Sequence, residues 1–396
     1  MNSYFHQKKK QYRDALIDDV IPFWEKHSID EAYGGYFTCL GREGNVYDRD
    51  KFIWLQARQV WTFSLLYQKV ESRPEWFNIA EHGYRFLKQH GRDVNGNWYF
   101  SLNRKGQPLI QPYNIFSDCF AALAFHEFAL ISDNAEAREI AVNTYKNILF
   151  RKDNPKGQYE KSVSGTRPMK SFALPMMLSL LAMELQDVLT DEQVTQTIDE
   201  SIDEIINVFW NEKEQVIHEH VKADNTFSDS FDGRLINPGH GIESTWFLMD
   251  IAKYRNDTDL IHNAVQILLA QLDYGWDGQY EGIFYFRDVK NHPPDKLEWD
   301  QKLWWVHLEA LVALSRAWLL TGNERCIEWY KKVDAYTWEH FPDPEYGEWF
   351  GYLNRQGEPY LSLKGGKWKG CFHLPRALWE CWQNFEMLEN KQKNNH

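Results

Sequence analysis

Two histidines stand where helices are expected to begin. His240 follows a Pro-Gly pair and His373 precedes Pro375, and proline suits the first turn of a helix. The partial positive charge at a helix N-terminus disfavours the imidazolium, so we expect both rings to be neutral near physiological pH. A neutral imidazole is a usable general base. The alternative for each is a histidine that only caps its own helix.

Each histidine has a polar partner one helical turn further along the chain. Glu243 follows His240 by three residues, and Arg376 follows His373 by three. Side chains with this spacing share one face of a helix. Two such pairs are a rarer coincidence than one, which favours a shared acid–base site over two unrelated caps.

Two further segments carry polar groups that suit a sugar. Trp305 and Glu309 are spaced i, i+4, so a ring that stacks on a sugar lies beside oxygens that bind hydroxyls. The alternative is a packed Trp beside a solvated Glu. Arg58 lies in an otherwise apolar helical pattern, where an unpaired guanidinium is costly. We expect Arg58 to point into a polar cavity. The alternative is that its side chain extends to solvent.

A glycine-rich basic loop and a pair of histidines carry weaker signals. The loop could cradle a phosphate, or be a plain basic loop, since it lacks the Walker spacing. Its candidate residues are Lys364, Gly365, Gly366, Lys367 and Lys369. His218 and His220 alternate, as on one face of a strand, but no further metal ligands can be placed with them. We therefore predict no metal site.

The elements that must position these residues form a repeat. Phrases rich in glycine and aromatic residues begin at Gly34, Gly96, Gly157, Phe227, Gly282 and Gly347, 55 to 70 residues apart. Helical patterns lie between them, at 3–28, 52–70, 74–90, 115–131, 135–151, 171–187, 191–211, 240–254, 257–273, 301–321, 323–340 and 374–389. One helix pair per phrase predicts an all-α fold, an (α/α)6 barrel or six-hairpin toroid, with short β-hairpins at one rim.

Composition limits the classes of protein that the chain can belong to. The 396 residues carry a net charge of −13, which argues against nucleic-acid binding. No apolar stretch of membrane-spanning length and no secretory signal is expected. Five scattered cysteines favour reduced thiols and a cytoplasmic protein. No linker divides the chain, so we predict one domain over 1–396 with a frayed tail at 390–396.

The sequence resembles the N-acylglucosamine 2-epimerase family over nearly its whole length. The resemblance is carried by DKFIWLQARQVW around Arg58, RPMKSFALPMM around Pro175, NPGHGIESTWFL around His240, KLWWVHLEAL around Glu309 and GGKWKGCFHLPRALW around His373. It implies an (α/α)6 barrel that interconverts N-acetyl-D-glucosamine and N-acetyl-D-mannosamine. His240 and His373 would be the acid–base pair, and Arg58, Glu243, Glu309 and Arg376 would shape the sugar site. The family also implies a homodimer and an unconsumed ATP activator bound at the Lys364–Lys369 loop.

Other functions stay open at this stage. Cellobiose 2-epimerases and aldose–ketose isomerases carry an additional His near the stretch that here reads Phe172-Ala173-Leu174-Pro175-Met176, which contains none. This favours the N-acyl branch. A six-hairpin glycoside hydrolase would need two carboxylates, and Glu243 and Glu309 could supply them while leaving the histidines idle. A binding protein without catalysis is a further alternative.

Overall fold

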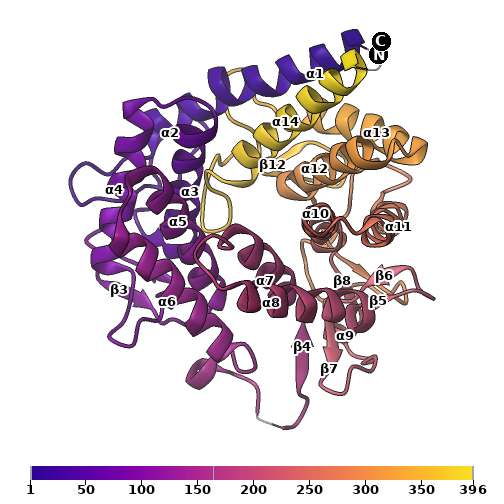
Figure 1. The fold of residues 1–396 in the computed structure, drawn as a ribbon, viewed down its shortest axis with the longest axis horizontal. Helices are drawn as coiled ribbons and strands as arrows, with labels where there is room; N and C mark the ends of the chain where they lie inside the picture. The colour runs from indigo at the N-terminus through magenta and orange to yellow at the C-terminus, as the bar shows by residue number, and fades with distance from the viewer. Residues whose placement is uncertain (1, 164, 395–396) are drawn as a thin grey trace.

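The helices of the computed structural model, which describes residues 2–163 and 165–394, form a ring (Figure 1). Inner helices are paired with the helix that follows each in the chain. The inner helices are α3 (Ile53–Lys69), α5 (Ile115–Ser132), α7 (Ala173–Glu184), α10 (Pro238–Arg255), α12 (Trp304–Thr321) and α14 (His373–Asn394). The outer helices are α4 (Pro74–His90), α6 (Ala135–Arg151), α8 (Asp191–Asp203), α11 (Thr258–Gly275) and α13 (Glu324–His340). The predicted (α/α)6 barrel is confirmed.

The ring closes through the two ends of the chain. The first helix, α1 (Asn2–Asp14), packs against the last, α14, and so supplies its outer partner. Figure 1 shows the two ends of the chain side by side. The segment before α14 joins it to α3, because the Thr62 hydroxyl donates to the carbonyl of Cys371 at 2.8 Å. Phe372 also packs edge-on against Trp61.

Burial explains the two layers. The inner helices α3 and α12 are buried over nearly their whole circumference, as their continuous apolar sequence requires. The outer helix α4 buries only one face, which includes Trp76, Ala80 and Leu87. Among the described residues one helix, α5, is long and apolar enough to cross a membrane, contrary to the expectation from the sequence, but 78% of it is buried within the fold. Its packing against α3, α6 and α7 accounts for its apolar composition.

Short strands precede the inner helices at one rim of the ring. These strands are β1 (Lys51–Phe52) before α3, β4 (Met169–Ser171) before α7, β8 (Leu235–Ile236) before α10 and β10 (Lys302–Leu303) before α12. They pair with β2 (Ser101–Leu102), β7 (His220–Lys222), β9 (Arg287–Asp288) and β11 (Tyr352–Leu353), respectively. Two further strands, β3 (Pro108–Ile110) and β12 (Pro359–Leu361), extend the first and the last of these sheets, and β5 (Trp210–Asn211) pairs with β6 (Val216–Ile217) as a separate two-stranded sheet. The same rim holds the starts of α10 and α14, and therefore both candidate histidines.

Four of the six glycine-aromatic phrases fold alike, and two do not. After four outer segments the chain makes an isolated bridge, namely Ile29–Tyr36, Arg92–Trp98, Trp276–Ile283 and Pro342–Trp349. The phrase at Gly157 instead forms a 3-10 turn, Gly157–Tyr159, with no buried residue. The phrase at Phe227 leads into the short helix α9 (Phe231–Arg234). The prediction of a hairpin was wrong at Gly157, because the one aromatic side chain there, Tyr159, is not buried against the ring.

Three ion clusters, each built on a buried aspartate and a buried lysine, repeat around this rim in the described part of the chain. In each, an aspartate after an outer helix binds a lysine that precedes an inner helix and an arginine from a Leu-X-Arg-X-Gly turn. The clusters are Asp30–Lys51–Arg104, Asp277–Lys302–Arg355 and Asp343–Lys364–Arg42, with N–O distances of 2.8 to 3.1 Å. Each links three segments distant in the chain and so fixes the start of an inner helix.

Helix ends differ from the predictions at three places. The expected helix 3–28 contains a π-helical turn, Ala15–Val20, before α2 (Ile21–His27). Pro22 explains the wider turn, because proline cannot donate the usual backbone hydrogen bond. The expected helix 191–211 ends as a π-helical turn at Phe209. The predicted frayed tail is helical over 390–394, where α14 continues, and 395–396 lie outside the described residues.

Candidate active site

His240 stands at the start of α10 and is held by a carboxylate from another segment. The Asn237 side chain caps the helix by accepting from the His240 backbone N–H at 3.3 Å. Nδ1 of His240 lies 3.0 Å from both carboxylate oxygens of Glu219. Backbone hydrogen bonds to Phe172 and Leu235 fix Glu219 in turn. Because a carboxylate only accepts, Nδ1 carries the hydrogen and Nε2 is left for a substrate.

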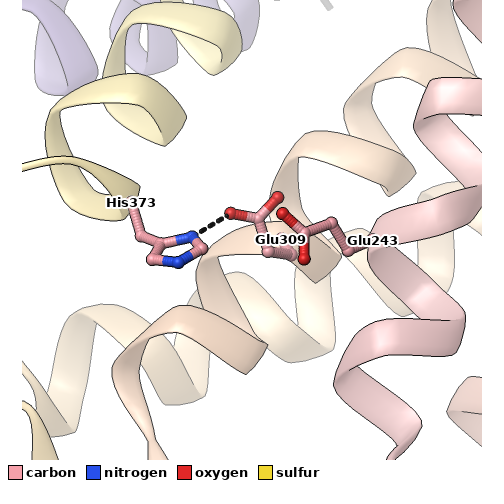
Figure 2. Close-up of side chains that lie close together, drawn as sticks. All are labelled: Glu243, Glu309 and His373. Carbon is pink, nitrogen blue, oxygen red and sulfur yellow. Dashed lines mark hydrogen bonds and ion pairs between the residues drawn. The ribbon is translucent and has the colours of Figure 1, made fainter. Parts of the chain in front are cut away.

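His373 is held in the same way from the other side. Its Nδ1 donates to Oε1 of Glu309 at 2.8 Å, as the dashed line in Figure 2 marks. The other oxygen of Glu309 accepts from the Trp246 indole N–H at 2.9 Å. Within residues 2–163 and 165–394, no group forms a hydrogen bond with Nε2 of either His240 or His373. Both rings therefore present the same atom to a ligand.

Arg376 joins the two glutamates of the site. One of its guanidinium nitrogens lies 2.7 Å from Oε1 of Glu243 and 2.7 Å from Oε1 of Glu309. Glu243, Glu309 and His373 place ligand atoms within 4.8 Å of one another, a spacing that could hold a metal ion (Figure 2). The guanidinium already supplies positive charge to both carboxylates, so charge balance does not call for a metal there.

Trp305 connects the two histidines. Its ring centroid lies 5.3 Å from that of His240 and 5.7 Å from that of His373. Both imidazoles therefore lie beside the same indole ring. His240 has a side chain that is 28% exposed, whereas the His373 side chain is 10% exposed. The site thus opens to solvent on the His240 side.

Arg58 reaches this site from α3 and is held by aromatic rings. Its guanidinium carbon lies 3.9 Å from the ring centroid of Phe120, 4.7 Å from Trp54 and 4.9 Å from Phe372. Its buried Nε has no hydrogen-bond partner in the described part of the chain. Burial lowers the pKa of Arg58 to about 9, opposed by the charges of Glu243 and Glu309. Arg58 is thus buried rather than solvated, as expected, but its immediate neighbours are aromatic rings and not the polar cavity that the sequence predicted.

The two histidines differ in their electrostatics, although their places at helix starts predict the same behaviour for both. Burial opposes charge on His240, but the adjacent Glu219 carboxylate outweighs it and raises the pKa of His240 above its ordinary value. Burial, Arg58 and Arg376 hold the pKa of His373 well below its ordinary value. The place of each histidine at a helix start could not predict this difference in pKa. Glu219 is distant from His240 in the sequence, Arg58 comes from another helix, and Arg376 lies one turn further along α14.

The predicted phosphate loop is largely buried. Lys364 pairs with Asp343 at 2.8 Å, and Lys369 pairs with Glu348. Gly365 packs against the backbone of Thr38, and Gly366 is buried as well. These four residues are therefore structural in this conformation, and among the five named only Lys367 is exposed. The loop lies beside α3, since the Trp54 indole donates to the carbonyl of Lys367 at 3.2 Å.

Sequence reasoning missed two residues of the site. Glu219 lies between His218 and His220, and the alternation of that segment drew attention to the histidines. His218 instead binds Glu214 and the carbonyl of Gly233, away from the site. Trp246 lies one turn after Glu243 on the same helix, and that spacing could have indicated it.

Solved structures identify the fold. A cellobiose 2-epimerase from Spirochaeta thermophila superposes with a TM-score of 0.82 at 21% identity, covering 98% of each chain. This is an (α/α)6 barrel, the fold class that the helical ring defines. At this level of identity the likeness concerns the fold alone.

The sequence comparisons identify the family. Residues 35–377 match the family described as N-acylglucosamine 2-epimerase (GlcNAc 2-epimerase), and the chain belongs to it. The N-acylglucosamine 2-epimerase of Mus musculus is 38% identical over 383 residues, which cover 94% of this chain and 91% of the relative. A cellobiose 2-epimerase from Dictyoglomus turgidum is 25% identical over 394 residues, covering 94% and 97%. The resemblance noted in the sequence is thereby confirmed.

Proposed function

We propose that the protein interconverts N-acetyl-D-glucosamine and N-acetyl-D-mannosamine by moving one proton at carbon 2. The observation that carries this is the pair of imidazoles, each fixed through Nδ1 by a carboxylate and each in contact with Trp305. An epimerase needs one group to remove a proton and another to return one to the opposite face. Relatives named for this reaction support the choice of sugar.

The chemistry follows from the open-chain sugar. Its aldehyde at carbon 1 makes the hydrogen on carbon 2 acidic, because the electron pair released from the C2–H bond can form a C1–C2 double bond while negative charge moves onto oxygen 1, which gives an enolate that keeps the acetamido group on carbon 2. Nε2 of one histidine takes the proton from one face, and Nε2–H of the other donates to the opposite face. General acid–base catalysis of this kind contributes about 10²- to 10⁴-fold for each group. No cofactor is consumed.

The remaining residues bind and orient. Arg58 forms no direct ion pair with a carboxylate among the described residues, so its charge suits stabilisation of negative charge on oxygen 1. Trp305 offers a ring face for the sugar between the histidines. Glu243 and Glu309 share Arg376, which fixes the carboxylate that orients His373. That sharing disfavours a glycoside hydrolase, whose acid needs a carboxyl with a raised pKa.

We extend the proposal to the state of the protein. A single domain over residues 1–396 agrees with the continuous helical ring, and a cytoplasmic location agrees with five free, buried cysteines. The homodimer rests on the family resemblance alone. Activation by ATP stays part of the proposal, with Lys367 as the exposed basic residue of the predicted loop. The partner is a small amino sugar, and the net charge of −13 fits neither nucleic acid nor an anionic membrane.

Proton NMR of N-acetylmannosamine in D₂O tests the function, with and without ATP. We expect N-acetylglucosamine carrying deuterium at carbon 2. A ketose formed from mannose in a parallel incubation would instead identify an aldose–ketose isomerase, because that reaction needs a hydroxyl on carbon 2, and an unchanged spectrum of N-acetylmannosamine would contradict the proposal. His218→Asn is the matched control, because His218 also binds a glutamate but lies outside the site, and this variant should keep full activity.

A further inference from the structure

The two catalytic histidines have different carboxylate partners. Glu219 contacts His240 with both oxygens, and no cation pairs with Glu219 in the described part of the chain. Glu309 divides its oxygens among His373, Arg376 and Trp246. A full negative charge therefore faces His240, whereas the charge that faces His373 is compensated.

We propose that Glu219 is a positioning residue that keeps His240 protonated, so that the resting enzyme has His240 as its acid and His373 as its base. This inference rests on the proposed function and deepens it. In the resting form, Nε2 of His373 takes the proton from carbon 2, and Nε2–H of His240 gives one to the opposite face. The product leaves behind protonated His373 and neutral His240.

The enzyme must then exchange protons to return to its resting form. The His240 side chain is 28% exposed and that of His373 is 10% exposed, so His240 is the histidine that can regain its proton from water. A sugar whose C2 hydrogen faces His373 can react with the resting form without a prior proton exchange. The opposite epimer must bind the exchanged form, which Glu219 disfavours.

Other groups around His240 either favour or oppose its protonation. Glu243 on its own helix also favours the protonated ring, but its charge is shared with Arg376. His373 on α14 opposes a second positive charge beside it. Trp305 on α12 carries no charge, and the Tyr285 phenol near Glu219 has a raised pKa and stays neutral. Glu219 is thus the one uncompensated carboxylate that touches His240 among the described residues.

The variant Glu219→Gln tests the inference. Gln keeps an oxygen that can accept from Nδ1, so it holds the ring while it removes the charge. The profile of kcat/KM against pH should be a bell whose falling limb reports His240 and whose rising limb reports His373. In the variant we expect the falling limb to move down by about 1 to 3 pH units, with the rising limb unchanged. Both directions must shift equally, because pH does not change the equilibrium between two neutral sugars.

The matched control is Glu214→Gln, which removes a carboxylate that binds His218, a histidine outside the site. We expect no movement of either limb. A Glu219→Gln enzyme that loses activity equally at every pH, or whose falling limb does not move, would overturn the inference.

A second measurement does not depend on activity or on the variant's folding. Histidine ring NMR of the unliganded wild-type protein, with the His240 signal assigned by its loss in His240→Asn, should show His240 titrating above its ordinary value of about 6.5. Titration at or below that value would overturn the role of Glu219, even in an enzyme that epimerises. An inactive wild type with a raised His240 titration would instead contradict the proposed function alone.

Discussion

Nδ1 of His373 lies 2.8 Å from Oε1 of Glu309, and the same carboxylate is bound by an arginine and a tryptophan. The imidazole is thereby fixed as one tautomer, with Nε2 free for chemistry. The orientation of His373 depends on α10, α12 and α14 together, since Trp246, Glu309 and Arg376 come from those three helices.

Replacement of Glu309 by Gln should lower kcat more than it raises KM. Gln cannot accept from His373, Arg376 and Trp246 at once, because its amide nitrogen only donates. We expect kcat to fall by about 10²- to 10⁴-fold, the range for a misplaced acid–base group. The control is Glu380→Gln, which removes a carboxylate that binds Arg316, two helical turns further along α14 and α12. The control should lose stability but keep kcat, and equal losses of kcat in both variants would contradict the orienting role of Glu309.

Replacement of Arg58 by Met should separate stability from activity. The buried guanidinium has an unsatisfied Nε, and burial lowers its pKa to about 9. An apolar side chain of similar length removes that cost, so the free energy of unfolding should stay equal or rise by about 1 to 4 kcal/mol. Activity should fall by about 10²-fold or more, because the charge opposite oxygen 1 is lost. Urea unfolding and initial rates measure the two effects, and a variant that is both unstable and active would refute this account of Arg58.

The Lys364–Lys369 loop offers a paired test of structural against binding roles. Lys364→Met breaks a buried pair with Asp343 and should cost about 3 to 5 kcal/mol of unfolding free energy. Lys367→Ala changes an exposed residue and should alter stability by less than about 0.5 kcal/mol. If ATP activates the enzyme through this loop, Lys367→Ala should weaken that activation. Equal effects of the two changes on stability would contradict the structural role of Lys364 in the ion cluster with Asp343.

Asp30→Asn should make the protein less stable in a pH-dependent way. Burial opposes ionisation of Asp30, but Arg104 and Lys51 outweigh it and lower its pKa to about 2, against about 3.9 in an unfolded chain. The stabilisation is therefore complete above about pH 5 and is lost as pH falls through about 2. The difference in unfolding free energy between wild type and variant should be large at pH 6 and should shrink towards pH 2. A difference that does not change with pH would show that the Asp30 charge is not the cause.

The fold was predictable because its signal is local and repeated. Helical periodicity placed the inner and outer helices to within a few residues, apart from the π-helical turns at Ala15–Val20 and Glu204–Phe209. Those turns depend on packing and on Pro22, which periodicity does not report. The loop that begins at Gly157 escaped prediction for the opposite reason, since glycine and aromatic residues are present there but nothing buries them.

The site was predictable only where a residue's partners lie on its own helix. His240 with Glu243, and His373 with Arg376, follow from spacing. The structure joins Glu243, His373 and Arg376 to Glu309, and His240 lies beside Trp305, which also contacts His373. Glu219 reaches His240 across 21 residues of chain, through a strand pairing that no local pattern encodes. The direction of the His240 pKa shift therefore could not be derived from its place at a helix start.

Hydrogen exchange at carbon 2 by single-histidine variants tests the central claim most directly. Each epimer is incubated in D₂O with His240→Asn or His373→Asn, and deuterium at carbon 2 is followed by proton NMR. Neither variant should interconvert the sugars, yet each should exchange the C2 hydrogen of one epimer only, and the two variants should prefer opposite epimers. Exchange of the same epimer by both variants, or full epimerisation by either one, would contradict a pair of histidines acting on opposite faces of one carbon.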